Sequence, residues 1–147
     1  MKFSLLGATL VAATVVMHAV VTVWWVRYLV HRYEPGHRAW RPREMLYALT
    51  ATAVVLLALH SVEIGLWAFA YHELVPAGDL GTFEEAMYFS FVTFTTLGYG
   101  DITLSEGWRL LSGIEALNGI LLVGWSTALL FAIVQRSFAK AQEHPSG

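Results

Sequence analysis

The chain has no cysteine, and only 14% of its 147 residues are charged. The missing cysteine excludes a disulfide framework and any zinc, haem or iron–sulfur site built on that residue. With 56% hydrophobic residues and a mean hydropathy of +0.56, the chain is too apolar for a soluble domain, whose surface must be wetted. A net charge of -2 without a long basic run excludes the electrostatic footprint of a nucleic-acid-binding protein. The composition indicates one membrane domain.

Lysine and arginine are absent between Arg43 and Arg109. Basic residues gather instead after the first apolar segment and after the last one: Arg27, Arg32, Arg38, Arg41, Arg43, Arg136 and Lys140. Cytoplasmic loops retain such residues, so both regions are predicted to be cytoplasmic and the N-terminus to lie outside. The arginine cluster is interpreted as setting this orientation and meeting anionic lipid headgroups.

Three apolar segments, at about 3–30, 45–71 and 108–134, are long enough to cross a bilayer. A basic residue before an apolar run is also how a secretory signal begins. The first run is about twice the usual signal length, and Trp24, Trp25 and Tyr28 are typical of interfacial anchors. We therefore expect an all-α integral membrane protein with three transmembrane helices.

A fourth, shorter helix is predicted between the second and third apolar segments. Thr82 and Glu85 form the pattern of a capping box, which starts a helix running to about Thr95. Its aromatic and apolar residues are unsuited to water. We expect it to dip into the membrane and an extended segment to climb back out. Irregular backbone at that depth is tolerated only where it is buried in protein or lines an aqueous path.

The returning segment reads Thr-Thr-Leu-Gly-Tyr-Gly-Asp at 95–101. Glycine-rich turns are common in loops, so the pattern also admits a simple turn. Within this helical context, however, the segment resembles the selectivity filter of the potassium channel pore-domain family. A dehydrating potassium ion needs stacked carbonyl oxygens from four chains, and Gly98 and Gly100 can adopt the torsions that point carbonyls one way.

The resemblance implies a selectivity filter at Thr96, Leu97, Gly98, Tyr99 and Gly100. Potassium would bind the carbonyls of the first four and the threonine hydroxyl. Tyr99 would pack outward onto the short helix, and Asp101 would brace the outer mouth. Leu97 stands where valine is usual, and Val92 stands where some members carry a carboxylate behind the filter.

In the third segment the resemblance implies a hinge at Gly119, whereas close helix packing explains the same glycine equally well. Packing is the preferred explanation for Gly124. Ile120, Val123 and Thr127 share one helical face and would line a water-filled cavity.

Ionisable residues within the spanning segments are costly and are therefore functional candidates. His60 and Glu63 lie three residues apart on one face, where they could pair, share a proton or hold a metal. Glu115 and His18 could approach them. Ordinary hydrogen bonding between helices behind the pore is the preferred interpretation of all four.

The chain divides into an N-terminal helix with a basic linker (1–44), a pore domain (45–136) and a short cytoplasmic tail (137–147). The first helix lacks the regularly spaced arginines of a voltage sensor and is interpreted as a lipid-facing element packed outside the second. With so short a tail, gating is expected at the filter or through a separate regulatory protein.

The predicted protein is a homotetrameric, potassium-selective, multi-pass channel of the plasma membrane, with no enzymatic activity and no cofactor beyond the permeant potassium ion. Two alternatives remain open. One is a weakly selective cation channel. The other is a non-conducting membrane partner or metal-binding protein built around His60, Glu63 and Glu115.

Overall fold

The computed structural model describes residues 2–33 and 41–143, with side chains at 4–33 and 41–136. This part of the chain contains four α-helices and no strand: α1 (Lys2–Tyr33), α2 (Pro42–Leu74), α3 (Phe83–Phe94) and α4 (Arg109–Glu143). Three of them are long and apolar enough to span a membrane, over Ser4–Tyr33, Pro42–Leu74 and Arg109–Arg136. The predicted all-α membrane fold is confirmed.

Local chemistry sets both ends of α2. Pro42 occupies its first turn, where the missing N–H is harmless, and the Arg41 backbone N–H donates to Oε2 of Glu44 at 2.9 Å. The helix ends at Leu74 because Val75 precedes Pro76, and the residue before proline avoids the helical region. The helix therefore extends three residues beyond each end of the predicted segment.

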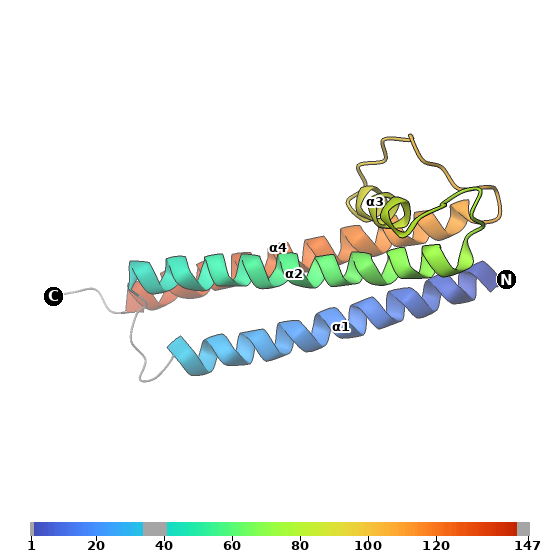
Figure 1. Ribbon diagram of the computed structural model, residues 1–147. Coiled ribbons are helices and arrows are strands. Elements are labelled where there is room, and N and C mark those ends of the chain that lie inside the picture. Colours follow the sequence, from blue (N-terminus) through green and yellow to red (C-terminus); the bar gives the residue numbers. More distant parts are fainter. Residues whose placement is uncertain (1, 34–40, 144–147) are drawn as a thin grey trace.

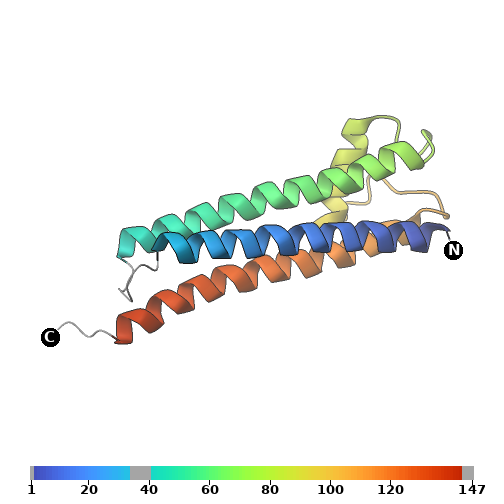
Figure 2. The ribbon, with the colours of Figure 1, turned by 90° about the horizontal axis from the view of Figure 1, so that it is seen from below.

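The three long helices form a layered bundle. Seen from the side, α2 and α4 overlap, with α3 on one side of them and α1 on the other (Figure 1). Seen from below, α1 lies between α2 and α4 (Figure 2), and it contacts both of them. The first residues of α1 lie at the same end of the bundle as α3 and the 95–108 loop.

The prediction for the first helix was incomplete, because α1 packs against α4 as well as α2. The Asn118 amide of α4 donates to the Thr14 hydroxyl of α1 at 2.8 Å, and the Trp25 indole of α1 donates to Thr52 of α2 at 2.9 Å. These buried polar contacts fix the position of α1 along the other two helices. Its opposite face is apolar and exposed, as lipid contact requires; Val20 is 62% exposed.

The main core forms where α3 crosses α2 and α4. Trp67 and Tyr71 of α2, Phe94 of α3, and Leu111 and Leu122 of α4 are at most 1% exposed. In a membrane such side chains hold helices together through close van der Waals packing, since lipid tails are as apolar as leucine. The core holds the short helix against the long ones and so positions the loop that follows it.

Three of the predictions fall wholly or partly beyond the described parts of the chain. Arg38 and most of the basic linker lie outside the described residues, as does the side chain of Lys140. Of the expected tail, residues 137–143 continue α4 as helix, and the rest lies outside the description.

Candidate functional site

The short helix α3 starts with the predicted capping box. The Thr82 hydroxyl accepts from the Glu85 backbone N–H at 3.1 Å, and Oε2 of Glu85 accepts from the N–H of Thr82 at 3.0 Å. The same oxygen also accepts from Gly81 at 2.8 Å. These bonds satisfy donors that a helix start leaves unpaired. The direction of α3, and thus the position of its C-terminal end, is fixed at its first turn.

The backbone of the returning segment alternates in handedness. Thr96, Gly98 and Gly100 have positive φ angles of 59°, 54° and 77°, whereas Leu97 and Tyr99, between them, do not. The two glycines are the residues that sequence reasoning expected in this conformation. Thr96 was missed, because a threonine with positive φ is uncommon. Positive φ at every second residue, extended back from Gly100 and Gly98, would have predicted a positive φ at Thr96.

The amide groups of this segment face α3. The N–H of Thr96 donates to the Thr93 carbonyl at 2.9 Å, and the N–H groups of Leu97 and Gly98 both donate to the Val92 carbonyl, at 2.9 and 3.3 Å. In a trans peptide the C=O points opposite to the N–H of the following residue. The carbonyls of Thr95, Thr96 and Leu97 are therefore directed away from α3. The side chain of Val92 has no hydrogen-bonding group, so Val92 holds this segment through its backbone carbonyl.

Leu97 and Tyr99 are 56% and 66% exposed in the single chain. The expected packing of Tyr99 onto the short helix is therefore not made within one chain. A Cβ added at Gly98 or Gly100 would meet nothing within 4 Å. The need for glycine at these positions is thus torsional rather than steric.

Asp101 follows the alternating segment and is tied to α3. The Tyr88 hydroxyl donates to Oδ2 of Asp101 at 2.7 Å. This hydrogen bond lowers the pKa of the Asp101 carboxyl from its ordinary value, because it favours the ionised form. Residues 96–101 are thereby attached to α3 at both ends, through the amides of 96–98 and through Asp101.

Gly119 of α4 lies directly against the last residue of α3. A Cβ there would overlap the Phe94 carbonyl oxygen and come within 2.8 Å of its carbon. Backbone atoms cannot move aside cheaply, so only glycine permits this approach. The contact supports close packing as the reason for Gly119. At Gly124 an added Cβ meets nothing within 4 Å, so one chain provides no packing partner for it.

The predicted cavity residues lie on an exposed face of α4. Ile120 is 59% and Val123 44% exposed, and Thr127 is also exposed. A pocket of about 430 Å³ adjoins this face, between α2, α4 and the end of α3. Val123, Thr127 and Thr95 contribute to its lining, so it begins where α3 ends.

A family model described as an ion channel matches residues 57–136, which is 80 of the chain's 147 residues. The chain belongs to this ion channel family. Members carry the two-helix pore domain of the potassium channel type, and α1 is additional to it. No solved structure matched the chain.

Glu115 of this channel does not approach His60 and Glu63, as the sequence had suggested. It is fully buried beside Tyr71 and Ser90 instead. The Tyr71 hydroxyl donates to Oε2 at 2.7 Å, and the Ser90 hydroxyl bonds Oε1. Ser90 also lies 3.0 Å from the Ile64 carbonyl. Glu115 therefore joins α4 to Tyr71 of α2 and to Ser90 of α3.

We expect Ser90→Ala to destabilise the channel by about 1–3 kcal/mol, because it leaves a buried carboxyl oxygen without its partner. Thermal unfolding in detergent measures the loss. Ser61→Ala is the matched control, since the exposed Ser61 hydroxyl bonds only the Leu57 carbonyl of its own helix. Equal stability of the two variants would show that the Glu115 contacts do not hold α3.

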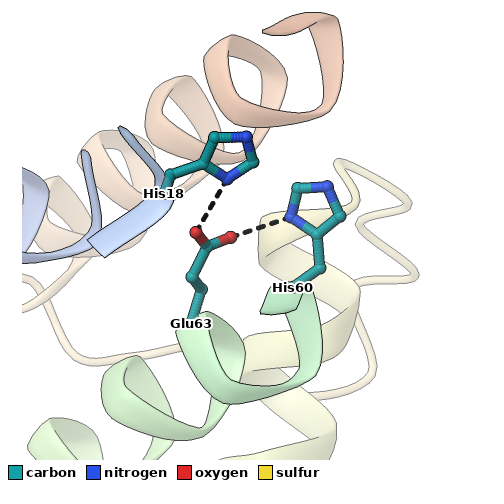
Figure 3. Close-up of side chains that lie close together, drawn as sticks. All are labelled: His18, His60 and Glu63. Atoms are coloured by element: carbon teal, nitrogen blue, oxygen red, sulfur yellow. Dashed lines mark hydrogen bonds and ion pairs between the residues drawn. The ribbon is translucent and has the colours of Figure 1, made fainter. Parts of the chain in front are cut away.

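His60 and Glu63 pair as their spacing predicted, and His18 joins them. Nδ1 of His60 lies 2.8 Å from Oε2 of Glu63, and Nδ1 of His18 lies 2.9 Å from Oε1 (Figure 3). Nε2 of His60 lies 2.9 Å from the Ser126 hydroxyl of α4. The cluster therefore connects all three long helices.

The pKa of Asp101 provides a test of the hydrogen bond between Tyr88 and Asp101. Its ionised form is favoured by Tyr88, so the contact is fully formed above the ordinary aspartate pKa and is lost as the pH falls through the lowered value. Tyr88→Phe removes the donor and is expected to raise the Asp101 pKa. Carbon-13 NMR titration of labelled aspartate measures it. An unchanged midpoint would mean that the hydroxyl does not bond Asp101 in the channel.

Proposed function

We propose that four copies of this chain form a potassium-selective channel, with residues 96–100 of each copy lining one quarter of the filter. The observation that carries the proposal is the alternating backbone at Thr96, Gly98 and Gly100. The amides of Thr96, Leu97 and Gly98 in this segment bond back to α3. Carbonyl oxygens directed away from α3 provide the ligands that replace the water around a potassium ion.

A single chain offers one strand of such carbonyls, whereas an ion on an axis needs a ring of them. Closed fourfold symmetry provides that ring. The proposal accounts for the exposure of Leu97 and Tyr99 in a single chain, since neighbouring copies cover both side chains in the ring. In the tetramer, Tyr99 packs against a neighbouring chain.

Conduction is passive and follows the electrochemical gradient. Ions pass in single file between sites at Thr96, Leu97, Gly98 and Tyr99, each displacing the next. The C-terminal end of α3 carries partial negative charge and stabilises a cation in the cavity lined by Ile120, Val123 and Thr127. The chain crosses the plasma membrane with its N-terminus outside, and lipid covers the exposed face of α1. The opening stimulus acts on the filter or comes from a separate regulatory protein.

The test uses the purified full chain. Native mass spectrometry in detergent is expected to give the mass of four chains. Liposomes containing the protein are expected to release potassium when a proton ionophore is present to balance the charge, and to release sodium far more slowly under the same gradient.

Equal potassium and sodium release would favour a weakly selective cation channel instead. A tetramer that released neither ion under any membrane potential would contradict conduction and favour the non-conducting alternative.

A further inference from the structure

His18, His60 and Glu63 form a cluster that the conduction mechanism does not use. His18 and Glu63 are fully buried, and the His60 side chain is only 14% exposed. Both imidazoles face the Glu63 carboxylate (Figure 3). His18 approaches it from α1, and His60 lies three residues before Glu63 in α2. In the described residues this is the one group of three such side chains placed to hold a metal ion.

The donor set is that of a divalent transition metal. Two imidazole nitrogens and one carboxylate oxygen are a recurrent protein ligand set for zinc, with a fourth position left for water. One donor atom from each residue lies within 4.8 Å of the others. A tetrahedral zinc ion holds its ligand atoms roughly 3.4 Å apart. For the three atoms to share one ion, a separation of 4.8 Å would have to shorten by about 1.4 Å.

A partner is in place to orient one of the ligands. An imidazole that binds metal through Nδ1 carries its proton on Nε2, and that N–H needs an acceptor. The Ser126 hydroxyl lies 2.9 Å from Nε2 of His60 and provides one.

The second imidazole has an unused nitrogen. Nε2 of His18 is buried and has no hydrogen-bond partner. The Trp125 ring, whose centroid is 5.4 Å from that of His18, is the neighbour available to a proton there, through a weak N–H···π contact. Metal binding at Nδ1 places a proton on this nitrogen.

An ion can reach the cluster from one side. His60 and Ser126 both line the pocket of about 430 Å³ beside the predicted cavity face of α4. The other two ligands, His18 and Glu63, are fully buried. Access through this pocket explains why the ligand on its edge is the partly exposed one.

We propose that His18, His60 and Glu63 bind one divalent transition-metal ion, zinc fitting best, and that this ion ties α1 to the pore domain. The ligands come from α1 and α2, and Ser126 of α4 orients one of them. This proposal stands independently of whether the chain conducts potassium.

Zinc binding to the chelator-treated full chain in detergent tests the site by calorimetry. One zinc ion per chain is expected to bind. His60→Gln and Glu63→Gln are expected to weaken binding by at least about tenfold, and Ser126→Ala by about 10–100-fold. His72→Gln is the matched control, since His72 is exposed on α2 and stacks edge-on against Phe83.

Thermal unfolding provides a second measurement, because an ion that binds only the folded chain stabilises it. Zinc is expected to raise the unfolding temperature of the unmodified chain and of His72→Gln, but not of Glu63→Gln. His60→Gln alters only a partly exposed side chain and keeps the test valid if Glu63→Gln misfolds. Equal binding by all variants, or no stoichiometric binding, would overturn the proposal.

Discussion

Gly98→Ala is expected to reduce potassium flux to the background of empty liposomes. The φ of Gly98 is 54°, where a Cβ costs about 1–2 kcal/mol per residue. In the proposed tetramer every subunit contributes this residue, so the strain is incurred four times. The backbone relieves it by turning the carbonyl out of line, which removes ligands from the ion. Potassium release from liposomes, normalised to the amount of tetramer, measures the effect.

Gly78→Ala is the matched control for this variant. Gly78 lies in the turn after α2, has no positive φ, and an added Cβ meets nothing within 4 Å. Its flux is expected to equal that of the unmodified chain. If Gly98→Ala conducted as well as Gly78→Ala, residues 96–100 would not be the conducting segment.

Gly119→Ala is expected to be the most disruptive single methyl group in the pore domain. The added carbon would lie 2.8 Å from the Phe94 carbonyl carbon and overlap its oxygen. Separating α4 from the end of α3 costs typically 1–3 kcal/mol, as overpacking does. It also moves the start of the proposed filter, which directly follows α3. We expect a lower unfolding temperature together with loss of potassium flux.

Gly124→Ala separates packing from hinge motion. It lies five residues further along α4, where an added Cβ meets no atom within 4 Å, and alanine favours the helix. This variant is expected to keep both stability and flux. A hinge at Gly119 predicts a different result, in which Gly119→Ala keeps its unfolding temperature and changes only the fraction of time that the pore is open.

The helices and the capping box were predictable because their signals are local. Hydropathy located the three long helices, and Thr82 and Glu85 located the start of α3 to the residue. The positive φ angles of Gly98 and Gly100 were predictable because glycine adopts such angles freely. Thr96 is not a glycine, so its residue type does not indicate a positive φ; only its place two residues before Gly98 does.

Contacts between distant segments were the part that the sequence could not supply. The spacing of His60 and Glu63 predicted their pairing, because helix geometry relates residues three apart. His18 joins them because of the position of α1 along α2. No local sequence pattern predicts that position. Glu115 was wrongly grouped with them for the same reason. It lies one turn from Gly119, but its partners Tyr71 and Ser90 come from two other helices.

The reversal potential of the reconstituted protein tests the central claim most directly. With potassium on one side of a planar bilayer and an equal concentration of sodium on the other, the account predicts a reversal potential far from zero, in the direction that opposes potassium flow. Gly98→Ala under the same conditions is expected to pass no current. A current that reverses near zero would contradict selection of potassium by the carbonyls of residues 96–99.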